Sequence, residues 1–224
     1  MLLRLRTGQH RSGDDILPFV TGAARRCYGS LMNRRELFLM SDAALRDVID
    51  MIDRDQLTRA APAEWSRKPN PTLRDIIAAH AYDEAWVPDV LAGRSADDVG
   101  SRYDGDLLGD DPIASYDAIN DAATDAVSGD LDFDKTVHLS YGDFPLGDYL
   151  VHTSIYRAFQ AWSIGHLLGL DYSLPEPLVD ALWEYVGPQI DEFRAMGVFP
   201  PEVHVPDNAD SQTRLLAKTG YWVP

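Results

Sequence analysis

The sequence predicts a mainly α-helical protein with one short β-hairpin. Apolar side chains recur at helical spacing over several long stretches, and residues that favour helix starts and ends stand at the borders of these stretches. A short strand-like run followed by a turn sequence predicts the hairpin near residues 135–145. The expected helices cover residues 41–53, 72–92, 112–128 and 148–168, with a fifth over 176–196.

Length and composition predict a single domain. The chain has 224 residues, of which 45% are hydrophobic, so it is long enough to bury one substantial core. No run approaches the roughly 18 apolar residues that a membrane-spanning helix needs. The single cysteine, Cys27, cannot form an internal disulfide, which favours a reducing compartment. We therefore expect one helical domain over residues 36–224 in a cytoplasmic protein with no membrane partner.

Charge is unevenly distributed along the chain. The net charge is −16, yet residues 1–35 carry seven arginines against Asp14 and Asp15, a net charge of +5. The remainder carries 13 basic and 34 acidic residues, a net charge of −21. An acidic surface repels phosphate groups, so no nucleic-acid partner is expected. This difference in charge between the two parts of the chain predicts that residues 1–35 are an N-terminal extension, poorly ordered in its first part.

Ser41 is the expected N-cap of the first helix. The stripe that follows it is formed by Leu45, Val48, Ile49 and Ile52. A polar loop with several prolines then covers residues 58–71, and its Trp65 is expected to pack against the core.

The helix expected over residues 72–92 carries the first candidate site. Thr72 and Asp75 have the spacing of a capping box, and Gly93 is placed to end the helix. One face is apolar at both ends and polar in the middle: Leu73, Ile76, Ile77, His80, Glu84, Val87 and Leu91. The polar pair at its centre suggests a ligand-binding or catalytic face. A single histidine on an apolar stripe is more often a hydrogen-bonded core residue.

The next stretch contains a helix and a hairpin. Asp111 followed by Pro112 predicts a helix start, and this helix should end near Gly129. The preceding 104–106 Asp-Gly-Asp sequence fails the calcium-loop pattern, because Ser115 stands where a bidentate glutamate is needed. Residues 136–141 read as a strand and 142–147 as a turn that folds back, with His138 on the surface or rim.

The helix expected over residues 148–168 ends at Gly169 and is again polar in the middle of its inward stripe. That stripe contains Tyr149, Thr153, Tyr156, Gln160, Ser163 and Leu167. Further along, the 187–188 Gly-Pro pair should kink the helix at 176–196, and residues 211–219 read as a short closing helix.

The order of these elements, with several stretches inside them, resembles the actinobacterial branch of the DinB/YfiT-like superfamily. That branch includes metal-binding proteins and the mycothiol-dependent maleylpyruvate isomerase. The similar stretches span roughly residues 40–220 and are 65–80, 90–95, 103–112, 137–150 and 197–220. The resemblance implies a four-helix bundle that holds a divalent metal, zinc or nickel, at three side chains. In thiol-dependent members such a metal activates a small thiol, for example mycothiol.

The resemblance carries over only partly to the ligand positions. His80 matches the first family ligand, whereas the positions of the second and third hold Tyr156 and Gln160 in place of an acid or histidine. Ser163 replaces the usual aspartate after Trp162. A neutral phenol and an amide are weak ligands for zinc, so the implied metal affinity is lower than in relatives with a complete set.

Two alternatives follow from this departure. A shifted metal site could combine His80 with Glu84 and His152. Otherwise the pocket has lost the metal, and His80, Tyr156, Gln160 and Arg157 bond to one another. Under either alternative we expect a pocket between the 72–92 and 148–168 helices. It would be formed by His80, Tyr156 and Gln160, with Glu84, His152, Arg157 and Ser163 around it.

Three functional hypotheses remain open from the sequence. The first is a metal- or thiol-assisted transferase or isomerase acting on a small electrophile. The second is a non-catalytic small-molecule-binding or stress-related bundle protein with a degenerate metal site. The third is a structural or interaction protein whose polar core serves specificity alone. The resemblance is compatible with a homodimer. The chain contains no G-x-S-x-G, no Walker-type phosphate loop and no G-x-G-x-x-G that opens a helix.

Overall fold

The computed structural model describes residues 32–223, so the predictions that concern residues 1–31 and Cys27 lie outside the described part of the chain. Over the described residues the structure is mainly helical, with a small two-stranded antiparallel sheet, as the sequence predicts. The long helices are α1 (Arg34–Asp50), α2 (Leu73–Leu91), α4 (Pro112–Ser128) and α5 (Leu146–Leu168).

Shorter elements connect and follow these helices. They are the 3₁₀ turns η2 (Gln56–Thr58) and η3 (Ala63–Trp65), the helix α3 (Ala96–Val99), the strands β1 (Thr136–Leu139) and β2 (Gly142–Pro145), and then α6 (Glu176–Val186), η4 (Gly187–Gln189), α7 (Ile190–Ala195) and α8 (Ser211–Thr219). The helix predicted over 176–196 is broken at η4, because a proline lacks the N–H that would continue the helical ladder.

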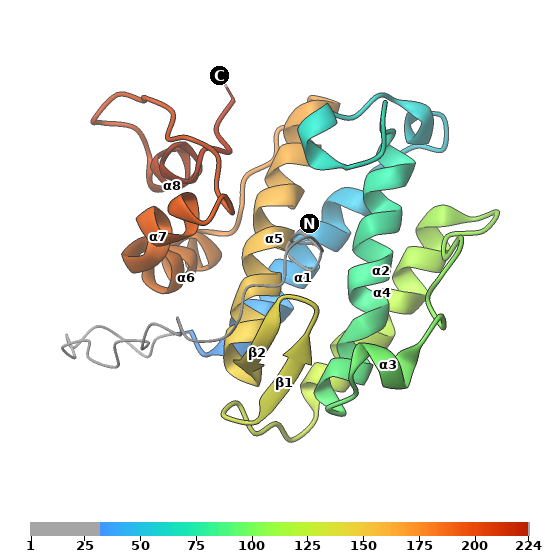
Figure 1. Ribbon diagram of the computed structural model, residues 1–224. Coiled ribbons are helices and arrows are strands. Elements are labelled where there is room, and N and C mark those ends of the chain that lie inside the picture. The colour runs from blue at the N-terminus through green and yellow to red at the C-terminus, as the bar shows by residue number, and fades with distance from the viewer. Residues whose placement is uncertain (1–31, 224) are drawn as a thin grey trace.

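The long helices pack in pairs. α1 runs along α5, α2 runs along α4, and α1 also contacts α4. The apolar stripes that the sequence predicts are buried in these contacts. The backbones of α2 and α5 approach each other far less closely than those of α1 and α5. Figure 1 shows α6, α7 and α8 on the side of α5 that faces away from α2. Long side chains must therefore cross the space between α2 and α5.

The start of α1 corrects the sequence prediction. The Asn33 side chain accepts a hydrogen bond from the Glu36 N–H, and the Glu36 carboxylate accepts one from the Asn33 N–H, so the cap lies eight residues before Ser41. Ser41 lies inside the helix and donates to the Phe38 carbonyl at 2.9 Å. Leu37 and Phe38 are fully buried, and the first turns of the helix, upstream of Ser41, place both against the core. The helix begins at Arg34, before the predicted domain boundary at 35/36.

The hairpin is confirmed, but its turn lies earlier than predicted. β1 and β2 pair from Thr136 opposite Pro145 to Leu139 opposite Gly142. Residues 140 and 141 make the two-residue turn, and Gly142 has a φ of 138°, which only glycine adopts readily. The 142–145 segment, expected as a turn, pairs as a strand because pairing satisfies its backbone groups. His138 is exposed, as predicted, and lies 2.8 Å from an Asp143 carboxylate oxygen.

The other predicted helices agree closely with the structure. α2 begins with the Thr72–Asp75 capping box, and α4 begins at Pro112 with the Asp111 side chain as its cap. Gly169 ends α5 in the left-handed conformation, with a φ of 73°. Trp65 packs against the main core from the loop before α2. Among residues 32–223 no helix has the length and hydropathy to cross a membrane.

Candidate functional site

α2 presents two adjacent faces to the rest of the molecule. The inner face carries the predicted stripe, of which Ile76, His80 and Glu84 are buried. The second face carries residues 75, 78, 79, 82 and 83, which recur at helical spacing and line a pocket. Polar side chains of α2 therefore lie on two adjacent faces of the helix, one buried and one lining the pocket.

His80 and Tyr156 join α2 to α5. Their rings stack with centroids 4.4 Å apart and an interplanar angle of 22°. Burial lowers the pKa of His80 well below its usual range, and the nearby Arg157 charge acts in the same direction. Burial raises the pKa of Tyr156 well above its usual range, and the negative charge of Asp83 adds to the effect. The stacked pair is therefore an uncharged imidazole on an uncharged phenol at neutral pH.

Two polar atoms next to this stack lack a hydrogen-bond partner among the described residues. One is Nε2 of His80, and the other is the side-chain nitrogen of Gln160, which lies one helical turn after Tyr156 on α5. Both side chains are buried. An unsatisfied buried polar group costs about 1–3 kcal/mol, and such groups in a native protein call for an explanation.

Glu84 and Arg157 form a buried ion pair between the same two helices. The Arg157 Nε donates to a Glu84 carboxylate oxygen at 2.6 Å, and its Nη2 donates to the other oxygen. Both side chains are 1% exposed. The Arg157 guanidinium carbon lies 3.9 Å from the centre of the Phe38 ring on α1, which adds a cation–π contact.

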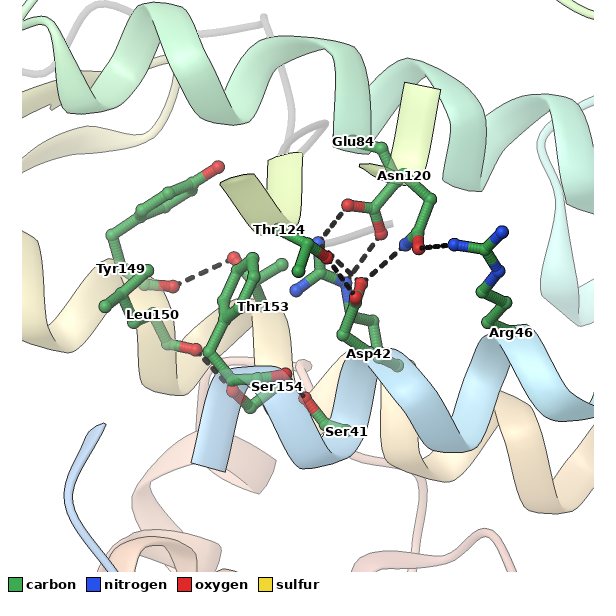
Figure 2. Close-up of polar contacts among 12 residues, drawn as sticks. Ser41, Asp42, Arg46, Glu84, Asn120, Thr124, Tyr149, Leu150, Thr153 and Ser154 are labelled. Carbon is green, nitrogen blue, oxygen red and sulfur yellow. Dashed lines mark hydrogen bonds and ion pairs between the residues drawn. The ribbon is translucent and has the colours of Figure 1, made fainter. Parts of the chain in front are cut away.

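Asp42 extends this ion pair to α1 and α4. Its carboxylate lies 3.6 Å from Arg157 Nη2, accepts from the Asn120 amide at 2.6 Å and accepts from the Thr124 hydroxyl at 2.7 Å. Arg46 bonds Asn120 at 3.4 Å from the outer side. Figure 2 shows these side chains converging from α1, α2 and α4. We call Asp42, Glu84, Arg157, Asn120 and Thr124 the ionic centre.

The ionic centre holds two carboxylates against one guanidinium. Burial and, to a smaller extent, the Asp42 charge raise the pKa of Glu84 to about 7 against the opposing attraction of Arg157. For Arg157, burial opposes the charged form, but Glu84 and Asp42 outweigh it and raise the pKa above its usual value. Glu84 is therefore the group in this centre that takes up a proton near neutral pH.

The pocket has a volume of about 320 Å³ and lies on the second face of α2. Ala78 and Ala79 line it, and their small side chains leave space that larger residues would fill. Residues of the 65–68 loop and of the 103–107 loop also line it, and Tyr156 lines it from α5. The same Tyr156 ring stacks on His80, which does not itself line the pocket.

Of the predicted pocket residues, the structure places only Tyr156 on the pocket wall. Glu84 was expected at the pocket margin but belongs to the ionic centre with Arg157. His152 lies near the hairpin instead, with its Nδ1 3.3 Å from the Tyr141 hydroxyl and its ring against Phe144. The reason is that residue 152 falls one helical turn before Tyr156, at the level of the hairpin. Gln160 and Ser163 are buried on α5 and do not line the pocket.

The donor set at the ligand positions fits zinc or nickel poorly. Nε2 of His80 is an available imidazole donor, but Tyr156 keeps its proton and Gln160 offers only an amide. The carboxylate of Glu84 is occupied by Arg157. Among residues 32–223 no three histidine, cysteine or acidic side chains come together in a group that could hold a metal. The implied metal stays a prediction.

Sequence reasoning missed the residues that line the pocket beside Tyr156. Tyr82 and Asp83 follow Asp75 by seven and eight residues, so a second helical stripe was present next to the first. Trp65 was expected in the core, whereas Tyr103 drew attention only as part of the 103–112 stretch. No family model matches the chain, and no curated protein or solved structure is significantly similar to it.

Proposed function

We propose that this protein binds a small organic molecule in the pocket beside Tyr156 without catalysing its conversion. The pocket itself carries the proposal: it has a volume of about 320 Å³ and is lined by aromatic rings together with a few charged side chains. Sites for small molecules are typically concave, about 300–1,000 Å³ in volume, and combine apolar walls with a few polar groups. The volume suits a ligand at the small end of this range.

The walls of the pocket support this proposal chemically. Trp65, Tyr82, Tyr103 and Tyr156 offer large, rigid surfaces that lose little conformational freedom on binding. Tyr103 is anchored, because its hydroxyl donates to the buried Asp89 carboxylate at 2.8 Å. A wall that is fixed before the ligand arrives reduces the entropic cost of binding.

We also propose that α1, α2, α4 and α5 form a DinB/YfiT-like four-helix bundle with a degenerate metal site. The order of the four long helices supports this proposal, as does the position of His80 on α2 facing Tyr156 on α5.

Filling the pocket is expected to abolish binding. In Ala79→Trp the indole would occupy the space above residue 79, whereas Ala122→Trp places the same side chain on the exposed face of α4. Ligand-observed NMR with a mixture of small aromatic fragments should detect binding to the natural protein and to Ala122→Trp, and at least tenfold weaker binding to Ala79→Trp, or about 1.4 kcal/mol. Equal binding to all three proteins would place the site elsewhere and overturn the proposal.

Elemental analysis tests the metal hypothesis separately. Protein purified without chelators or a histidine tag is expected to hold well below one equivalent of zinc or nickel, because Tyr156 and Gln160 are poor ligands. His80→Ala is expected to give the same low value. One equivalent in the natural protein that disappears in His80→Ala would contradict the binding-protein proposal and favour the metal- or thiol-dependent enzyme.

A further inference from the structure

Aromatic side chains reach the pocket from three separate parts of the chain. Trp65 comes from the turn η3 before α2, Tyr103 from the loop after α3, and Tyr156 from α5. Contacts between aromatic rings, stacked or edge-on, are favourable beyond the burial of their area. A flat ring bound in this pocket would therefore meet several aromatic neighbours.

α2 holds the Tyr103 ring in place. The Tyr103 hydroxyl donates to the Asp89 carboxylate at 2.8 Å, and the ring meets that of Trp86 edge-on, with centroids 5.6 Å apart. Asp89 is 4% exposed and also accepts hydrogen bonds from Arg94 at 2.6 Å and from Arg102 at 2.8 Å. Three donors of the segment that follows α2 therefore meet at one buried carboxylate. Hydrogen bonds to an ionised group are the stronger ones, so this carboxylate fixes the segment and with it the Tyr103 ring.

The Tyr156 ring is held by its stack with His80, in which the centroids are 4.4 Å apart and the planes differ by 22°. The imidazole occupies one face of the Tyr156 ring, so the opposite face and the edge are the parts that can line the pocket. Rings that are fixed before the ligand arrives lose little freedom when it binds. The two tyrosines thus form a prearranged aromatic surface.

The size of the pocket limits the ligand to a small ring system. Its volume of about 320 Å³ lies at the lower end of the range for small-molecule sites. Three of the lining residues, Ala78, Ala79 and Gly105, have a small side chain or none, which leaves this space open. A single ring or a pair of fused rings suits such a volume.

We propose, building on the binding function above, that the pocket selects a ligand with a planar aromatic ring, which lies against Tyr103 and Tyr156. Asp89 is the positioning residue of this site. It does not line the pocket, but its bond to the Tyr103 hydroxyl holds that ring where the ligand meets it.

Two uncharged probes with the same hydroxymethyl group, benzyl alcohol and cyclohexylmethanol, test the ring of the ligand. The saturated ring has the larger apolar surface, so the hydrophobic effect alone predicts that cyclohexylmethanol binds at least as tightly. Contact with fixed aromatic rings predicts the opposite order. Ligand-observed NMR titrations of the natural protein should give a Kd about fivefold lower for benzyl alcohol.

Substitutions locate the ring that is responsible. Tyr103→Leu should bring the affinities for the two probes to within about twofold of each other. Tyr185→Leu removes a half-buried ring from α6, outside the pocket lining, and should keep the fivefold preference. Asp89→Ala should lower the preference as Tyr103→Leu does, whereas Asp89→Asn still accepts from the Tyr103 hydroxyl and should keep more of it. If Tyr103→Leu or Asp89→Ala fails to fold, the order of the two probes on the natural protein still decides the matter.

The outcomes separate this inference from the binding function itself. Equal or tighter binding of cyclohexylmethanol, lost in Ala79→Trp, would overturn the aromatic ligand and leave the pocket as a binding site. No binding of benzyl alcohol to the natural protein would also overturn the aromatic ligand. In that case the fragment screen with Ala79→Trp and Ala122→Trp decides whether the pocket binds anything.

Discussion

Replacing Arg157 with alanine is expected to lower the free energy of unfolding by about 3–5 kcal/mol, the range found when one partner of a buried ion pair is removed. The guanidinium faces two buried carboxylates, Glu84 and Asp42, and the substitution leaves both without their cation. It also removes the contact with the Phe38 ring and empties the volume of one of the largest fully buried side chains. Chemical denaturation of the purified protein measures the loss.

A matched control separates the effect of breaking the ionic centre from the effect of removing an arginine side chain elsewhere. Arg54 is exposed, and within residues 32–223 its hydrogen bond goes to the backbone carbonyl of Asp110, so Arg54→Ala should change stability by no more than about 0.5 kcal/mol. If Arg157→Ala costs no more than Arg54→Ala, the ion pair between α2 and α5 does not stabilise the fold.

A triple substitution tests why Arg157 matters. The combination of Asp42→Asn, Glu84→Gln and Arg157→Met removes all three charges while keeping similar volumes and the acceptor for Asn120. Replacing a whole buried ionic group is often close to neutral, so this variant should recover at least half of the loss seen in Arg157→Ala. A triple variant as unstable as Arg157→Ala would show that packing, not unpaired charge, dominates the loss.

The parts of the fold that the sequence predicts well depend on neighbouring residues. The Thr72–Asp75 capping box and the Asp111 cap before Pro112 operate within a single helical turn, so they can be recognised from a few consecutive letters. The predicted start of α1 was wrong because it depends on residues outside a single turn. Ser41 and Asn33 both have capping chemistry, and only the burial of Leu37 and Phe38 against other helices decides between them.

The site was harder to predict because its partners are far apart in the chain. Asp42 contacts Asn120 and Arg157, which lie 78 and 115 residues further along, and nothing around Asp42 indicates such partners. His80, Tyr156 and Gln160 were expected to face a common pocket; the rings of His80 and Tyr156 do stack, but only Tyr156 lines the pocket. The pocket itself depends on irregular loops at 65–68 and 103–107, which carry no periodic signal.

Glu84 is expected to make the protein less stable as the pH rises through about 7. In the unfolded chain this carboxyl titrates near 4.5, whereas burial together with Asp42 raises its pKa to about 7 in the folded protein. A group with a raised folded pKa contributes its full stability below the unfolded value and loses it as the pH rises through the folded value. This stability is therefore lost between about pH 4.5 and about pH 7.

The size of the effect follows from the same two values. Each pKa unit corresponds to about 1.4 kcal/mol, so the contribution of Glu84 should fall by about 3 kcal/mol between about pH 4 and pH 8. In Glu84→Gln the side chain stays neutral and still accepts a hydrogen bond from Arg157, so this variant lacks the titration. The test compares natural protein and Glu84→Gln by denaturation at several pH values across this range.

The expected result is a difference between the two proteins that changes with pH. Near pH 4 they should have similar stability, and near pH 8 Glu84→Gln should be the more stable by a few kcal/mol. Glu202→Gln, which alters an exposed glutamate paired with Lys218, should follow the natural protein to within about 0.5 kcal/mol at every pH. The opposite result is that the natural protein becomes more stable relative to Glu84→Gln as the pH rises. In that case the attraction by Arg157 outweighs burial, and Glu84 is ionised over the whole pH range.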